Sequence, residues 1–78
     1  MDYVTYSVPA HFITAIYYAD YSGLDRNEEK ALNLFLHDIN GELHFENDNV
    51  EQYFDPYHDM KAYGILPCDC VEMICIPN

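Results

Sequence analysis

Basic residues are the scarcest feature of this 78-residue chain. Three Lys and Arg face fourteen Asp and Glu, which gives a formal net charge of −11 at pH 7. A protein that binds a phosphate backbone needs a surface patch of Lys and Arg, so direct nucleic-acid binding is excluded. Docking on an anionic membrane surface is excluded for the same reason. The charge predicts a basic partner, or else a solvated acidic surface that keeps a small protein soluble.

The chain also lacks repeats, long apolar runs and a targeting signal. Its longest apolar patch, residues 12–19, is interrupted by Thr14 and is too short to span a bilayer. The first residues hold neither the basic nor the apolar segment of a signal peptide, which predicts a cytoplasmic protein. The three cysteines are an odd number, and cytosolic thiols stay reduced, so we expect no disulfide.

Motifs for catalysis are missing as well. The sequence has no Gly-rich phosphate loop and no Gly-flanked serine of the nucleophile-elbow type. Its four histidines form no triad pattern, and the adjacency of His58 and Asp59 is only a weak cue for acid–base chemistry. A chain this short offers no obvious walled pocket, so we expect neither an enzyme nor a cofactor.

Apolar and aromatic residues are plentiful. Half of the chain is apolar, and eight Tyr and four Phe supply the aromatic content. This composition argues against disorder and is enough for one small core, so residues 1–78 are expected to form a single domain.

Hydrophobic periodicity predicts the elements. Alternation favours strands over residues 3–8, 42–46 and 70–76, the last with Val71, Met73 and Cys75 on one face. A helix is predicted over residues 25–38, where Asp25 and Glu28 have the spacing of a capping box.

The remaining segments are less regular. Residues 10–19 favour a short helix after Pro9, although their β-branched and aromatic content makes a strand the competing interpretation. Residues 50–66 are expected to be irregular, with a helical turn near 50–54. The order β-α-α-β-β predicts an α+β fold, a small three-stranded antiparallel sheet with two helices packed on one face.

The acidic residues fall into two groups in the sequence. On a strand, residues two apart project from one face roughly 6.6 Å apart, so carboxylates along a strand and its following loop can mimic the spacing of phosphates. The group at the turn and helix start is Asp20, Asp25, Glu28 and Glu29. The group on the strand and loop is Glu42, Glu46, Asp48, Glu51, Asp55 and Asp59. Of the nearby tyrosines, Tyr21, Tyr53 and Tyr57 are candidate anchors for a partner, with core-edge packing as the alternative.

The cysteines invite a metal interpretation. Cys68 and Cys70 point the same way on a strand, and His58 is a possible third ligand. The C-x-C spacing is not that of a zinc finger, and a fourth ligand is missing unless Asp59, Cys75 or His11 approaches. Buried thiols acting as small hydrophobes are the favoured interpretation, so no metal is expected.

One stretch resembles a known class of proteins. Residues 19–36 (ADYSGLDRNEEKALNLFL) and the tail Asp69-Cys70-Val71-Glu72 are similar to small acidic proteins of phages and other mobile elements, over about a third to a half of the chain. Some of these are anti-CRISPR proteins that imitate DNA and occupy the basic groove of a type I surveillance complex. The resemblance implies an α/β fold and a stoichiometric inhibitor in a bacterial cytoplasm. It carries over only Asp20, Asp25, Glu28 and Glu29, with no catalytic residue.

Two functions follow from these observations. The first is a DNA-mimicking inhibitor that blocks the DNA-binding site of a CRISPR complex, or of a restriction enzyme, as a monomer or small homo-oligomer. The second is an acidic adaptor or regulatory protein that contacts a host protein through a Tyr-rich surface. A thiol metal-binder using Cys68 and Cys70 is a third, weaker hypothesis.

Overall fold

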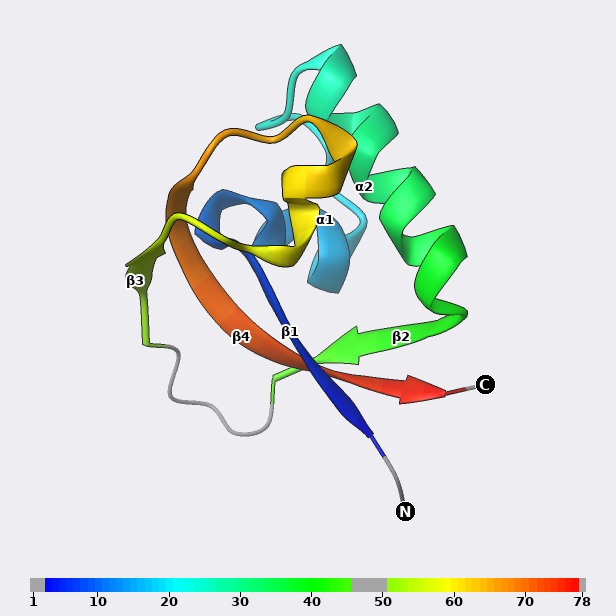
Figure 1. The fold of residues 1–78 in the computed structure, drawn as a ribbon. Coiled ribbons are helices and arrows are strands. Elements are labelled where there is room, and N and C mark those ends of the chain that lie inside the picture. Colours follow the sequence, from blue (N-terminus) through cyan, green and yellow to red (C-terminus); the bar gives the residue numbers. More distant parts are fainter. Residues whose placement is uncertain (1–2, 46–50, 78) are drawn as a thin grey trace.

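The last strand organises the sheet. The computed structural model describes residues 3–45 and 51–77, and within them each of the other strands pairs antiparallel with β4 (Cys68–Pro77). Strand β1 (Val4–Pro9) runs along one edge of β4. Strands β2 (Gly41–His44) and β3 (Tyr53–Asp55) both lie along the opposite edge, β2 beside residues 74–77 and β3 beside residues 68–70 (Figure 1).

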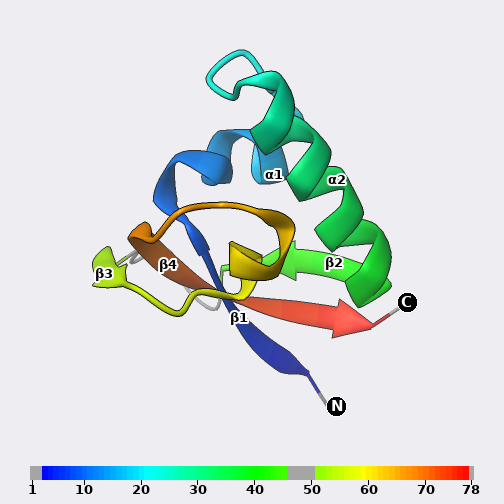
Figure 2. The same cartoon turned by 45° about the horizontal axis from the view of Figure 1, so that its top comes forward.

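Four helical segments accompany the sheet. They are η1 (Ala10–Phe12), α1 (Ile13–Tyr18), α2 (Arg26–Ile39) and η2 (Asp59–Tyr63). The helices α1 and α2 lie on the same side of the sheet (Figure 2). The α+β class with helices on one face is therefore confirmed.

The longest helix begins where its sequence predicts. The Asp25 carboxylate accepts the Glu28 backbone N–H at 2.8 Å, and the Glu28 carboxylate accepts the Asp25 N–H at 3.1 Å. This reciprocal pair is a capping box, which satisfies two of the donors that a helix N-terminus leaves free. Asn40 ends the helix in the left-handed conformation, with φ of 48°. The predicted helix over residues 25–38 is thus confirmed to within one residue.

The core lies between the helices and one face of β4. Val71, Met73 and Cys75 are buried there, as the alternation predicts, while Glu72 on the other face is exposed. The helices contribute buried side chains from both α1 and α2 to the same cluster: Phe12, Ala15, Ala31, Leu32 and Phe35, the first of them from η1. Tyr6 and Tyr63 close its border with edge-to-face contacts on the ring of Phe35.

The sheet has one strand more than the sequence predicts. The expected helical turn near residues 50–54 is wrong for Tyr53 and Phe54, which are extended in β3. Three residues are too few to show an alternation, and β3 is defined by pairing with β4, which is a tertiary contact. The predicted strand over 42–46 occupies Gly41–His44, and the final strand is longer than the predicted 70–76. Residues 10–19 are helical, as favoured, but begin with a 3₁₀ turn.

A close approach fixes the start of β2. A Cβ added to Gly41 would lie 2.6 Å from the Cys75 sulfur and 2.7 Å from the Ile76 carbonyl oxygen. Only glycine therefore fits at this point, where β2 joins the edge of β4.

Candidate functional site

Two carboxylates converge on Ser7 in strand β1. The Ser7 backbone N–H donates to Asp59 at 2.7 Å, and the Ser7 hydroxyl donates to Asp55 at 2.7 Å. Asp55 also accepts the backbone N–H of Tyr57 at 2.8 Å. The segment after β3 is thereby tied to the edge strand β1, and Asp59 satisfies an N–H that an edge strand otherwise leaves open.

Three carboxylates project from the face of the sheet opposite the core. Directly paired residues share a face, and Asp55 lies opposite Cys68, Ser7 opposite Glu72, and Glu42 opposite Ile76. Asp55, Glu72 and Glu42 therefore share this face, which we call the acidic face. Their register positions are four residues apart along β4. The Asp55 carboxylate nevertheless reaches Ser7, the residue directly opposite Glu72, so Asp55 lies near Glu72 and Glu42 lies farther along the strand.

Two residues of the acidic face and its surroundings have shifted pKa values. Partial burial, together with the charges of Glu72 and Asp55, raises the pKa of Tyr53 above its ordinary value. The hydrogen bonds from the Ser7 hydroxyl and the Tyr57 N–H lower the pKa of Asp55. Asp55 is thus held in its ionised form at neutral pH, and Tyr53 keeps its proton.

The acids of the helix start form a separate group. Glu28 contacts the His11 ring nitrogen Nε2 at 2.5 Å, and it completes the capping box with Asp25. Asp20 accepts the backbone N–H of Ser22 at 3.0 Å, and hydrogen bonding from the Ser22 side chain and this N–H lowers the pKa of Asp20. A groove lined by Asp25, Glu28, His11 and Cys68 adjoins this group and reaches the first residue of β4.

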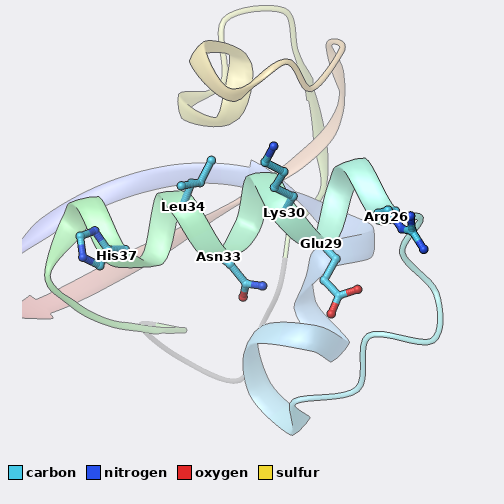
Figure 3. A pocket seen from close by; sticks show the side chains of 6 residues that line it. All are labelled: Arg26, Glu29, Lys30, Asn33, Leu34 and His37. Carbon is cyan, nitrogen blue, oxygen red and sulfur yellow. The ribbon is translucent and has the colours of Figure 1, made fainter.

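The outer face of α2 differs from these acidic groups because it carries positively charged side chains. A groove of about 450 Å³ there is lined by two of the chain's three Lys and Arg residues, one carboxylate and three residues without a formal charge (Figure 3). Its lining residues are Arg26, Glu29, Lys30, Asn33, Leu34 and His37. Glu29 therefore lines a different groove from the one that Asp25 and Glu28 line. The third cation, Lys61, lies over the Tyr57 ring, 5.1 Å from its centroid.

The carboxylates have few cationic partners. Asp2, Glu46 and Asp48 lie outside the described residues, which leaves eleven of the fourteen acids, and none of these eleven is buried. Among the described residues, the ion pairs within 4 Å all involve histidine, and none involves Lys or Arg. Within residues 3–45 and 51–77, the carboxylates are therefore presented to solvent without a paired Lys or Arg.

The sequence-predicted site residues divide as follows. Asp55, Asp59, Tyr53 and Tyr57 are brought together around Ser7, whereas Tyr21 packs against the core. Glu42 is on the acidic face but at the far end of β4, and Glu51 is exposed just before β3.

Two residues of this region were missed from the sequence. The alternation of residues 70–76 already placed Glu72 on the face opposite the core, but Glu72 was not counted as a site residue. No local pattern in the sequence predicts the role of Ser7, because its two acidic partners are 48 and 52 residues away in the chain.

A second polar group lies at the start of β4. One ring nitrogen of His58 and the sulfurs of Cys68 and Cys70 all lie within 4.8 Å of one another. Burial, and secondarily the neighbouring Cys68 thiol, raises the pKa of Cys70 to about 12, and burial also raises the pKa of Cys68. In the absence of a bound cation both thiols are therefore protonated at neutral pH.

None of the three residues considered as a fourth ligand joins this group. Asp59 is bonded to Ser7, His11 to Glu28, and Cys75 projects from the core face of β4.

Comparisons with known proteins give no assignment. No protein-family model, curated protein or solved structure matches this chain. None of the helices in the described residues is long and apolar enough to cross a membrane.

Proposed function

We propose that this protein is a DNA-mimicking inhibitor of the anti-CRISPR type. It binds the basic DNA-binding site of a host type I CRISPR surveillance complex in the bacterial cytoplasm and excludes target DNA. The observation that supports this most is the unneutralised charge. Eleven described carboxylates are at least partly exposed, and among the described residues no Lys or Arg is paired with any of them. A binding site for phosphates offers the complementary cations.

The arrangement of the acidic face supports the same proposal. Asp55 and Asp59 are held by short bonds to Ser7, so two of the charges need no ordering when a partner binds. Groups fixed before binding lose less conformational entropy in the complex. Tyr53 and Tyr57, from the same segment, supply aromatic surface beside the charges, and Tyr57 is 80% exposed. The mechanism is steric and electrostatic competition and involves no covalent step.

The proposal is tested by inhibition of DNA binding in a purified system. A purified type I surveillance complex is mixed with a labelled target duplex, and this protein is added in increasing amounts. We expect the labelled duplex to be displaced at stoichiometric amounts of the protein, and a higher concentration of the labelled duplex to restore its binding. The affinity of the protein for the complex is expected to fall steeply with added salt, because salt screens the charges. Unchanged duplex binding at a large excess of the protein would overturn the proposal for this target, and the same assay with a restriction enzyme tests the other target class.

The exposed apolar side chains favour a second candidate, an acidic adaptor that binds a host protein through aromatic surface. Tyr18, Phe54 and Leu66 are 76%, 63% and 81% exposed. Exposed large apolar groups are typical of protein interfaces when they gather. The two candidates differ in one measurement, since binding through aromatic surface would be nearly insensitive to salt and unaffected by competing DNA.

A further inference from the structure

We propose that His58, Cys68 and Cys70 form a binding site for a single Zn²⁺ ion. Their three candidate ligand atoms lie within 4.8 Å of one another, and they come from two segments, the residue before η2 and the first three residues of β4. Two thiolates and an imidazole are ligands that zinc takes in proteins, with an open fourth position where only three side chains bind. The ligand set therefore fits zinc in both chemistry and position.

The state of His58 is the observation that carries the proposal. This ring is 2% exposed, and its Nε2 lies 3.0 Å from the Leu66 carbonyl oxygen. A carbonyl only accepts hydrogen bonds, so Nε2 carries the proton and Nδ1 presents a lone pair. Nδ1 is buried and has no hydrogen-bond partner. Leaving a buried polar atom without a partner costs about 1–3 kcal/mol, and such an atom calls for an explanation.

A metal ion supplies that explanation. Histidines that bind metals commonly donate their other ring N–H to a backbone carbonyl, which fixes the tautomer and aims the free nitrogen at the ion. The Leu66 carbonyl has this role for His58. Cys68 and Cys70 share one face of β4, and both sulfurs lie within 4.8 Å of a ring nitrogen of His58.

Hydrogen bonding between the thiols and His58 does not account for the site. The Cys70 thiol donates to the Cys68 backbone carbonyl at 3.2 Å, and Nδ1 stays without a partner although two S–H groups are close. A disulfide between Cys68 and Cys70 would use both sulfurs and still leave Nδ1 unsatisfied. Coordination of one ion by all three residues satisfies Nδ1 as well.

The balance of charge also suits a dication. Binding releases two protons to solvent, one from each thiol, and the resulting pair of thiolates neutralises Zn²⁺. The surrounding negative charge attracts cations toward the site. Among the described residues no fourth acidic, histidine or cysteine side chain joins the group, so the fourth position is left to water. Cys68 also lines a shallow groove with Ala10, His11, Gln52 and Asp69, which gives the ion a route from solvent.

The test uses the full chain, stripped of metal with a chelator and kept reduced. Co²⁺ is added first as a spectroscopic probe and Zn²⁺ afterwards. We expect a thiolate-to-cobalt charge-transfer band that saturates at one equivalent and disappears when Zn²⁺ displaces the cobalt. Zn²⁺ is also expected to raise the melting temperature, because an ion that binds only the folded state stabilises it.

Two variants with one thiol removed give a matched comparison. Cys68→Ala removes a proposed ligand, and we expect its Zn²⁺ affinity to fall by more than about 100-fold, beyond the loss that an outer-shell change causes. Cys75→Ala removes the buried thiol of the core face and is expected to keep the affinity. His58→Gln tests the third ligand, and if that variant does not fold, Cys68→Ala still decides the question because Cys68 is only half-buried.

Three results would overturn the proposal. They are the absence of both the charge-transfer band and the thermal shift, equal Zn²⁺ affinity in Cys68→Ala and the unmodified protein, and binding of Cu(I) without any binding of Zn²⁺. The zinc site and the proposed inhibition are independent, since the first is measured on the isolated protein and the second on a surveillance complex.

Discussion

The two faces of β4 are made of alternating residues of one strand, and each buries a cysteine. On the core face Cys75 lies in an apolar cluster, and burial alone raises its pKa. On the opposite face Cys70 is equally buried, but its neighbours are Cys68 and an imidazole with a free buried nitrogen. Burial therefore does not separate a structural thiol from a candidate ligand. The polarity of the atoms that bury the thiol does.

The same contrast holds for the other side chains of the strand. Val71 and Met73 pack under the helices, whereas Glu72 is exposed on the acidic face and its charge contributes to the raised pKa of Tyr53. One face stabilises the fold and the other presents charge. The two faces should consequently respond differently to substitution, to pH and to partners.

The largest expected effect is on the core face. Met73→Ala removes a fully buried side chain, and such truncations cost about 2–5 kcal/mol because transfer energy is lost and a cavity remains. Ile74→Ala, one residue along and only partly buried, is the matched control and should cost clearly less. Urea unfolding of both variants measures the difference. Equal losses of stability would contradict the assignment of the two faces.

A smaller and pH-dependent effect is expected from Asp55→Asn. Hydrogen bonds from Ser7 and Tyr57 lower the pKa of Asp55 in the folded state, so the native protein favours the carboxylate. The resulting stability is present above the ordinary pKa of 3.8 and is lost as the pH falls through the lowered folded value. The variant should therefore be less stable than the unmodified protein at pH 7, with a difference that shrinks toward about pH 2. A difference that stays constant with pH would show that charge on Asp55 is not the cause.

The smallest effect is expected from Glu72→Gln. The charge of Glu72 contributes to the raised pKa of Tyr53, so its removal should lower that pKa, with little change in stability because Glu72 is exposed. An NMR titration that follows the ring of Tyr53 measures the shift. No movement of the Tyr53 pKa would mean that the Glu72 carboxylate lies too far from the Tyr53 hydroxyl to influence it.

Local patterns in the sequence account for much of the fold. The capping box of Asp25 and Glu28 and the alternation from Val71 to Cys75 are interactions between residues close in the chain, so the sequence displays them directly. Strand β3 is visible only through its pairing with residues 68–70, and three residues carry no periodicity of their own. This strand forms because of tertiary contacts with residues that are distant in the sequence, so a short stretch of sequence does not predict it.

The candidate sites depend still more on distant contacts. Ser7 gathers Asp55 and Asp59 across 48 and 52 residues, and His58 meets the two cysteines because the chain reverses between η2 and β4. The C-x-C spacing indicated that the two thiols share a face, and their register on β4 agrees. The unpartnered Nδ1 of His58 and the bond from Nε2 to Leu66 could not be predicted from the sequence, since they are set by one ring orientation in the folded chain.

The most direct test of the central claim compares charge reversal on two surfaces. Glu72→Lys changes the acidic face, and Glu29→Lys changes the outer face of α2 beside Arg26 and Lys30, so each variant alters the net charge by the same amount. The measurement is the affinity of each variant for the surveillance complex. We expect Glu72→Lys to weaken binding at least about tenfold, because like charges are then brought together, and Glu29→Lys to have a much smaller effect. Equal losses would mean that net charge alone drives binding, and would contradict the assignment of the interface to the acidic face.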